Sequence, residues 1–488
     1  MKLHILALLL LLIISGCKAP DLGLDIMQTK TDVPLIQQVA DTNSTDTASE
    51  CVIAIPEKAL VMQRTARGVA RNEKLEGYLN NILKKIQKAW PEKNIPSHVF
   101  LTPSAEFSAF YSDGGIFIAH GMLSEMESED EIAACLAHEY SHALLRHDTL
   151  AVGSQFASHL YGVANMYLQV KYGHKGVSGE LFEQYLLNQA LNEAAQSALL
   201  PAFSREQEDA ADALGTDLLI RAGYNPIAMT YLLQRVEDWE TRNQKKAEEN
   251  EIRFTKLFKS ETPSKTQEPA KQIDISLNKV VNEISNDLAK AYKELQRQHY
   301  PASEREMKVK EYIREYYAEV PRDFLQHQEL NSIMRDKGIN RFLAGLKRLE
   351  KSDQACYAKD TKTAKKHISV AYRVLHDDVA YARHISFEVT RMTRAGKVEQ
   401  LEKSCQEPDS LLRDHETLIR HYESKEPEKA LQLANETFKE FNKPTWMLPT
   451  LVRLHKRLDH DLIATAYYVA CMASGDPQVL NMCGESLK

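Results

Sequence analysis

Apolar residues recur at helical spacing through most of this chain, interrupted by two short stretches with a different pattern. In LEGYLNNILKKIQKAW the apolar positions fall on one helical face, which comprises Leu75, Leu79, Ile82, Ile86 and Trp90. The stretches SHVFLTP and GGIFIAH are β-branched or apolar and are flanked by Pro and Gly, so they predict strands. The pattern therefore predicts an α+β fold that is mainly α and contains a small β-sheet.

More helices are expected after the strands. A long helix should span Glu129 to Asp148, and further helices should cover 155–171 and 181–199. Pro201 interrupts the pattern just before SREQEDAADALGTDLLIRAG, an amphipathic helix that Gly223 closes. We expect these elements to form one domain over residues 56–242.

A change of composition at about residue 242 marks a boundary. Residues 243–272 are highly charged and contain two prolines, which is typical of a linker or loop. From 273 to 488 almost every segment fits helices joined by short turns. EKALQLANETFKEF and DLIATAYYVACMA share a pattern at an interval of about 34 residues, which is typical of tetratricopeptide-like (TPR-like) repeats. A helical bundle without repeats fits nearly as well.

The first seventeen residues, MKLHILALLLLLIISGC, differ from the rest of the chain. Their apolar run is shorter than the about 20 residues of a membrane-spanning helix and fits the core of a signal peptide. ISGC resembles a bacterial lipobox, which implies that residues 1–16 are a lipoprotein signal peptide and that Cys17 carries a lipid. Lys18 beside it favours sorting to the outer membrane, facing the periplasm. Residues 17–55 are then expected to form a flexible tether. A plain secretory signal with an incidental cysteine is the alternative.

Export makes disulfides possible among the six cysteines other than Cys17. Proximity in sequence favours pairing of Cys356 with Cys405 and of Cys471 with Cys483. The composition, 43% hydrophobic and 26% charged, is ordinary for a globular protein. A net charge of −7 over 488 residues gives no reason to expect nucleic acid as a partner.

The stretch ACLAHEYSHALLRHD carries the candidate chemistry. His138 and His142 are four residues apart and share one helical face, where both can bind one zinc ion. Glu139 is placed to act as general base on a water at the metal. The alternative is an ordinary histidine-rich helix, but burial of two histidines beside a glutamate costs free energy unless a partner satisfies them.

The spacing of a third ligand discriminates among zinc enzymes. Leu145 and Asp148 stand where a metzincin needs Gly and His, and Tyr161 and Gly162 stand where thermolysin-like and aminopeptidase spacings need Glu. Those classes are therefore excluded.

A later stretch, SREQEDAAD, supplies a better candidate. Glu208 can be the third zinc ligand, with water as the fourth. Asp212 lies four residues on, shares the same helical face, and can accept a hydrogen bond from a liganding histidine. The alternative for these acids is a solvated acidic face.

HEYSHALLRH, SREQEDAAD and LLIRAGYNP together resemble the M48 family of zinc metallopeptidases, and SAFYSDGGIFIAHGML is similar to the family's strand–turn–strand lead-in. The resemblance covers about residues 56 to 235. It implies a gluzincin-type fold with one zinc ion per chain. The site residues that it implies are His138, His142 and Glu208 as ligands, Glu139 as catalytic base and Asp212 as a support for a liganding histidine.

Together with the lipid anchor and the helical C-terminal region, the resemblance implies the bacterial envelope branch of the family. We therefore expect a zinc metalloendopeptidase that acts on unfolded or misassembled polypeptides in outer-membrane protein quality control. Ile116 to Ala119 are expected to form an exposed edge strand that pairs with an extended substrate. The group that stabilises the oxyanion stays open among His120, His147 and Arg205.

A second function class fits the same chain. The helical region could bind the envelope assembly machinery as a chaperone or assembly adaptor, with proteolysis secondary or lost. The presence of Glu139 argues against complete loss, because a protein without catalysis has no need of the base. A purely structural helical lipoprotein is the third reading.

Overall fold

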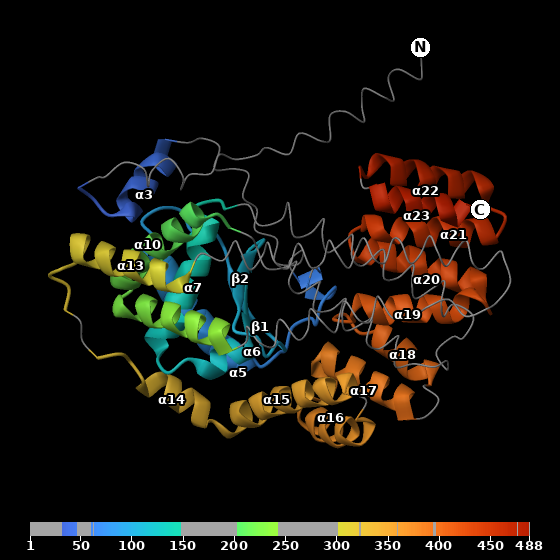
Figure 1. Ribbon diagram of the computed structural model, residues 1–488, viewed down its shortest axis with the longest axis horizontal. Helices are drawn as coiled ribbons and strands as arrows, with labels where there is room; N and C mark the ends of the chain where they lie inside the picture. The colour runs from blue at the N-terminus through green and yellow to red at the C-terminus, as the bar shows by residue number, and fades with distance from the viewer. Residues whose placement is uncertain are drawn as a thin grey trace, which may run out of the picture.

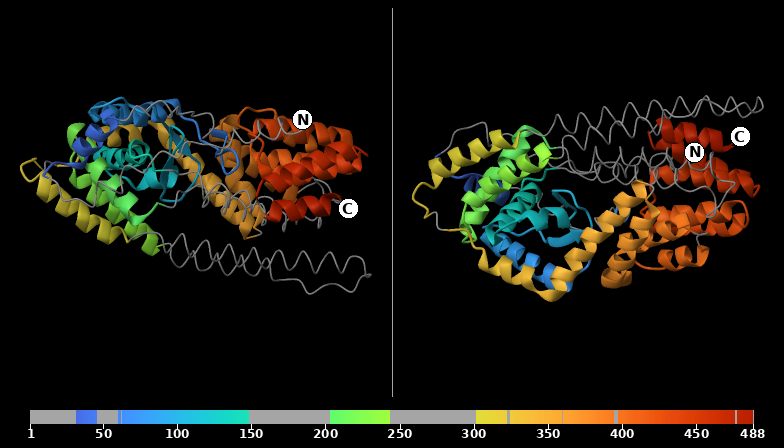
Figure 2. Two further views of the ribbon diagram at one scale, coloured as in Figure 1. Left: turned by 90° about the horizontal axis from the view of Figure 1, so that it is seen from above. Right: turned by 60° about the horizontal axis from the view of Figure 1, so that its bottom comes forward.

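A computed structural model describes residues 32–45, 60–147, 203–242 and 301–487, apart from 62, 322–323, 359, 394–396 and 476. The described chain is mostly helical with one three-stranded sheet, so the predicted mainly α, α+β fold is confirmed. The sheet and its helices form one end of the molecule, and stacked C-terminal helices form the other (Figure 1; Figure 2). Among the described residues, no helix is long and apolar enough to cross a bilayer. The helices expected at 155–171 and 181–199, the linker at 243–272 and Cys17 lie outside the described residues.

The sheet consists of β1 (His98–Thr102), β2 (Ala109–Ser112) and β3 (Gly115–Ala119) in the order β1-β3-β2. β3 pairs in parallel with β1 and antiparallel with β2. The expectation that Ile116 to Ala119 form an exposed edge is therefore wrong, because β3 is the central strand and all its residues are buried. The two runs expected as strands, β1 and β3, pair with each other. The turn at 113–114 places β2 on the other edge of β3.

Helices α5 (Glu73–Ala89) and α7 (Glu129–Leu144) pack against each other and against the sheet. Asn72 caps α5 by accepting a hydrogen bond from the Leu75 N–H, and Ser128 caps α7 through the Glu131 N–H. The predicted apolar face of α5 is confirmed, since every member is at most 4% exposed. On the opposite face of the sheet three aromatic rings stack, those of Phe100, Phe117 and Phe110.

Helix α3 (Leu35–Thr45) lies inside the segment that we expected to be a flexible tether. Leu35, Ile36 and Val39 are at most 2% exposed and belong to the main core. The Ile36 N–H donates to the buried carboxylate of Asp217, which anchors the start of α3. The expectation of a tether through residue 55 is thus wrong for α3, because three apolar residues on one face suffice to dock a short helix against an existing core.

Helix α10 (Arg205–Arg221) begins with a capping box formed by Ser204 and Gln207 and is followed by Gly223 at a φ of 82°. It packs closely against α7. A Cβ at Gly215 would lie 3.1 Å from the His138 backbone nitrogen and 2.9 Å from the Met229 side chain. A glycine at this crossing is what lets the two helices approach at the level of His138.

We expect Gly215→Ala to lower the free energy of unfolding by about 1–3 kcal/mol, because the added methyl group overpacks the α7–α10 contact. Gly77→Ala is the matched control: Gly77 also lies inside a helix, but nothing stands within 4 Å of its missing Cβ. That substitution should raise stability by about 0.5–1 kcal/mol. Urea unfolding measures the free energy of unfolding of both variants and of wild type. Equal values for Gly215→Ala and Gly77→Ala would refute the close contact at Gly215.

Helix α13 (Ala302–Tyr316) packs on α10, in the half of the molecule that contains the sheet (Figure 1). We expected these residues to belong to the separate helical region at 273–488. The helices after α13 form that region and pack largely in neighbouring pairs. They are α14 (Gln328–Arg335), α15 (Lys337–Tyr357), α16 (Thr361–Leu375), α17 (Ala380–Thr393), α18 (Val398–Cys405), α19 (Leu412–Glu423), α20 (Pro427–Glu440), α21 (Leu448–Arg457), α22 (Asp461–Ala473) and α23 (Pro477–Leu487). Whether they are true TPR-like repeats stays a prediction.

A short segment before α5 joins the two halves. Arg64 donates its Nε–H to the carbonyl of Ser410 at 2.7 Å, and Arg67 forms an ion pair of 3.0 Å with Glu350. Both arginines are buried. These contacts of buried charges hold the sheet-containing half and the helical region together.

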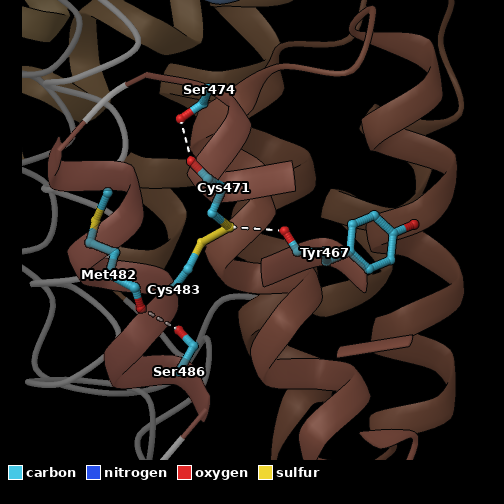
Figure 3. The surroundings of a disulfide bond; sticks show 6 residues. All are labelled: Tyr467, Cys471, Ser474, Met482, Cys483 and Ser486. Atoms are coloured by element: carbon cyan, nitrogen blue, oxygen red, sulfur yellow. Dashed lines mark hydrogen bonds between the residues drawn. A yellow bond between two sulfur atoms is a disulfide. The ribbon is translucent and has the colours of Figure 1, made fainter. Parts of the chain in front are cut away.

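A disulfide between Cys471 and Cys483 links α22 to α23 (Figure 3), as sequence proximity predicted. The other predicted pairing is wrong: Cys356 and Cys405 lie on different helices and form no disulfide. In this chain, sequence proximity thus predicted the disulfide correctly where the two cysteines lie on the adjacent helices α22 and α23.

Replacing Cys471 and Cys483 together with serine should lower the free energy of unfolding by about 3 kcal/mol. The two cysteines are 12 residues apart, and a bond that closes a loop of that length removes entropy mainly from the unfolded chain. Chemical unfolding of the variant measures the loss, and wild type in reductant should match it. Cys405→Ser serves as control, and an equal loss in that variant would contradict the role of the bond.

Candidate metal centre

Three side chains from α7 and α10 converge at the crossing of these helices. The Nε2 atoms of His138 and His142 lie 3.1 Å apart. One oxygen of Glu208 lies 3.6 Å from the Nε2 of His138, and its other oxygen lies 3.9 Å from that of His142. The helical spacing therefore brings the two histidines together, and the packing of α10 adds the acid.

The three donors fit a metal ion. They lie within 4.8 Å of one another, and the side chains are largely withdrawn from solvent. Two imidazole nitrogens and a carboxylate oxygen are the donor set of three-ligand zinc sites, and donors at zinc's usual bond length around a tetrahedron lie about 3.3 Å apart. The observed separations are close to that value, so the residues present could hold such an ion.

Asp212 stands behind His138. Its Oδ1 lies 2.9 Å from the Nδ1 of His138, on the opposite side of the ring from the metal-facing nitrogen. Burial alone would raise the pKa of Asp212, but Arg305 and His138 outweigh that effect and lower the pKa to about 2. The carboxylate in turn raises the pKa of His138 against the opposing effect of burial. Asp212 thus lies where a partner would fix the ring orientation of a liganding histidine.

His147 stands behind His142 in the same way. α7 ends at Leu144, and Arg146 adopts a φ of 56°, so the chain turns back and the His147 N–H donates to the His142 carbonyl. The Nδ1 atoms of the two rings are 2.8 Å apart. Burial and the neighbouring His138 and His147 hold the pKa of His142 well below its usual value, so its ring is neutral and able to bind a metal.

Sequence reasoning named His147 only as one of three candidates for stabilising the oxyanion and gave it no place behind a ligand. It also expected the helix to run on to Asp148. In a continuous helix a residue five positions after His142 would point away from it. The available signal for His147 was its position in the sequence, two residues after Leu145, the last apolar position of the helical pattern.

Glu139 lies beside the metal-facing rings and is 7% exposed. Burial raises the pKa of its carboxyl to about 7, opposed by His138 and by a hydrogen bond from the Tyr111 backbone in β2. A buried carboxyl beside a metal is suited to exchanging protons with a water molecule. Glu139 therefore lies at the junction of α7 with β2, and its role as catalytic base stays a prediction.

Sequence reasoning missed Arg305 of α13. Its guanidinium lies 2.8 Å from an oxygen of Glu208 and donates two hydrogen bonds to Asp212. It stands 93 positions from Asp212 in the chain, and nothing in the sequence pattern singles it out from the other arginines.

The other residues considered from the sequence are not among the three converging donors. Cys135 is buried with its Sγ against the sulfur of Met122, as expected of a small apolar side chain. His120 is buried too, and burial lowers its pKa to about 4 while Glu350 of α15 counteracts that shift. Arg205 is exposed in the first turn of α10.

Comparison with known proteins agrees with this geometry. The model of "Peptidase family M48" matches residues 70–313. The beta-barrel assembly-enhancing proteases of Yersinia pestis and Escherichia coli (strain K12) are each 27% identical, over 172 and 175 residues, which is 34% of this chain and 33% of each relative. The mitochondrial metalloendopeptidase OMA1 of Schizosaccharomyces pombe is 31% identical over 164 residues, 33% of this chain and 43% of that protein. The chain thus spans about a third of the length of the first two relatives.

The matched region begins just before α5 and ends within α13. It covers half of the chain and contains every residue of the candidate metal centre, Arg305 included. This chain belongs to peptidase family M48.

Proposed function

We propose that this protein is a zinc-dependent endopeptidase of the bacterial envelope that acts on unfolded or misassembled proteins in outer-membrane protein quality control. The observation that carries the proposal is the convergence of His138, His142 and Glu208 beside the buried Glu139. His138 and His142 would supply one imidazole nitrogen each to the ion, and Glu208 one oxygen. When bound, zinc would polarise the scissile carbonyl and lower the pKa of a bound water.

The protein's own groups then handle the protons. Glu139 accepts a proton from the attacking water and delivers it to the leaving amine. Burial raises the pKa of the Glu139 carboxyl, which makes it a stronger base than an exposed glutamate. Asp212 and His147 hold the rings of His138 and His142 so that each presents its Nε2.

The substrate is proposed to lie along β2. Among the described strands β2 pairs with β3 alone, and the Tyr111 backbone on its other side reaches Glu139. An extended peptide that added to this edge would pass directly by the base. Only chains that can extend would fit, which supports unfolded or misassembled proteins as substrates.

A test is to offer the protein one substrate in two states. A disulfide-bonded protein should resist cleavage when native and be cut within its chain when reduced and alkylated, and a chelator should stop the cutting. Cleavage of the native form at an equal rate would refute the proposed preference for extended chains. Absence of any cleavage by zinc-loaded protein would refute the peptidase function itself.

The proposed location has separate support. The lipobox-like ISGC motif favours a lipid at Cys17, and the disulfide between Cys471 and Cys483 suits an oxidising compartment. The names of the two bacterial relatives point to β-barrel assembly. Mass spectrometry of the purified N-terminus would test it, since an unmodified Cys17 in the mature protein would refute the anchor.

A second role, as an adaptor for the assembly machinery, is favoured by the exposed apolar side chains of α22. Leu462, Val469 and Met472 are 89%, 52% and 49% exposed. In a strain that lacks this gene, an adaptor role predicts that Glu139→Gln restores outer-membrane assembly whereas Leu462→Glu with Val469→Glu does not. The opposite result would leave proteolysis as the function.

A further inference from the structure

Arg305 connects α13 to the candidate metal centre. Its side chain is 13% exposed, and its Nε and Nη2 donate to the two oxygens of Asp212 at 2.8 and 2.7 Å. Its third nitrogen, Nη1, lies 2.8 Å from the Oε2 of Glu208. One guanidinium therefore binds two carboxylates of α10 at once, in the fork geometry that only arginine offers.

Both carboxylates face the histidines. Glu208 is the acid that we propose as a ligand, and Asp212 is the acid behind His138. Without a cation between them, these two acids and Glu139 would repel one another in a site with little water. A carboxylate that has one oxygen held by an arginine keeps a fixed orientation and has its other oxygen free for a metal.

We propose that Arg305 is a positioning residue of the metal centre. It fixes the orientation of Glu208 and Asp212, so that the ligand set is complete only when α13 is docked on α10. This inference rests on the proposed zinc site and extends it to a helix outside the ligand-bearing pair.

The same helix pair contains a matched control. Lys308 of α13 forms an ion pair of 2.5 Å with Asp209 of α10, on the same helix contact as Arg305, and Asp209 is not one of the three donors. Farther along α13, the Tyr312 hydroxyl donates to Asp217 at 2.9 Å. These contacts remain when Arg305 is replaced, so α13 should stay docked in the variant.

The test uses the full chain and reads metal binding rather than cleavage. Zinc affinity is measured by competition with a chelator, the ligand geometry by the visible absorption of the cobalt-substituted protein, and folding by thermal unfolding of the metal-free form. Arg305→Met should weaken zinc binding about 10–100-fold and shift the cobalt spectrum. Arg305→Lys should recover part of the affinity, because an ammonium restores the charge but not the fork. Lys308→Met should match wild type in affinity and spectrum.

Two outcomes would overturn the proposal. One is an Arg305→Met protein with wild-type zinc affinity and an unaltered cobalt spectrum. The other is an equal loss of zinc affinity and of metal-free stability in Arg305→Met and Lys308→Met. That result would mean that Arg305 only helps to dock α13 on α10. If Arg305→Met does not fold, Arg305→Lys decides by the same criteria. A wild-type protein that binds zinc here yet cleaves nothing would refute the peptidase function and leave this inference standing.

Discussion

Glu139→Gln is expected to slow cleavage of an unfolded protein such as casein by about 10²–10⁴-fold, the contribution typical of a general base, while zinc stays bound. Glutamine has nearly the shape of glutamate and can still accept the hydrogen bond from the Tyr111 backbone, but it cannot take a proton from water. Glu139 is also not one of the three converging donors. The substitution should therefore remove proton transfer and leave the metal in place.

Zinc content and the rate of casein cleavage are measured on the same preparation. Glu127→Gln is the control, since Glu127 precedes α7 and its side chain is 71% exposed. The control should cleave as wild type does. A Glu139→Gln protein that cleaves equally well would show that the peptidase assignment, or the identity of its base, is wrong.

His142→Ala and Glu208→Ala should each leave the purified protein with almost no zinc. Each removes one of the three donors that converge among the described residues, so the loss in affinity should exceed the about 10–100-fold that loss of a partner behind a ligand costs. Activity should disappear with the metal. Metal analysis after dialysis against a weak chelator provides the measurement.

Glu206→Ala is the matched control for Glu208→Ala. Glu206 lies on the same turn of α10 but is exposed and touches none of the donors. It should retain one zinc per chain. Full zinc occupancy in Glu208→Ala would mean that another residue is the third ligand.

The parts of this centre that could be predicted are those governed by local geometry. His138 and His142 share a face because the helix has 3.6 residues per turn, and the same rule places Glu208 and Asp212 together. That the two helices meet is a tertiary fact, inferred from the chemistry that a metal requires and from the resemblance to family M48. The glycine at 215, which permits the contact, is unremarkable in the sequence.

The parts that could not be predicted depend on chain reversals and distant contacts. His147 faces His142 only because a non-glycine residue, Arg146, adopts a left-handed conformation that the pattern does not signal. Arg305 reaches the centre from α13, and its role exists only in the folded protein. β3 was expected at an edge, but it is the central strand. The order in which strands pair is set by tertiary packing, which the sequence of one strand does not reveal.

The most direct test of the central claim is a zinc titration of activity. Metal-free protein receives increasing zinc, and cleavage of unfolded casein is measured at each step. We expect no cleavage without metal and a linear rise that stops at one zinc per chain. Cleavage by the metal-free protein, or a fully zinc-loaded protein that cuts nothing, would contradict the claim that this chain is a zinc peptidase.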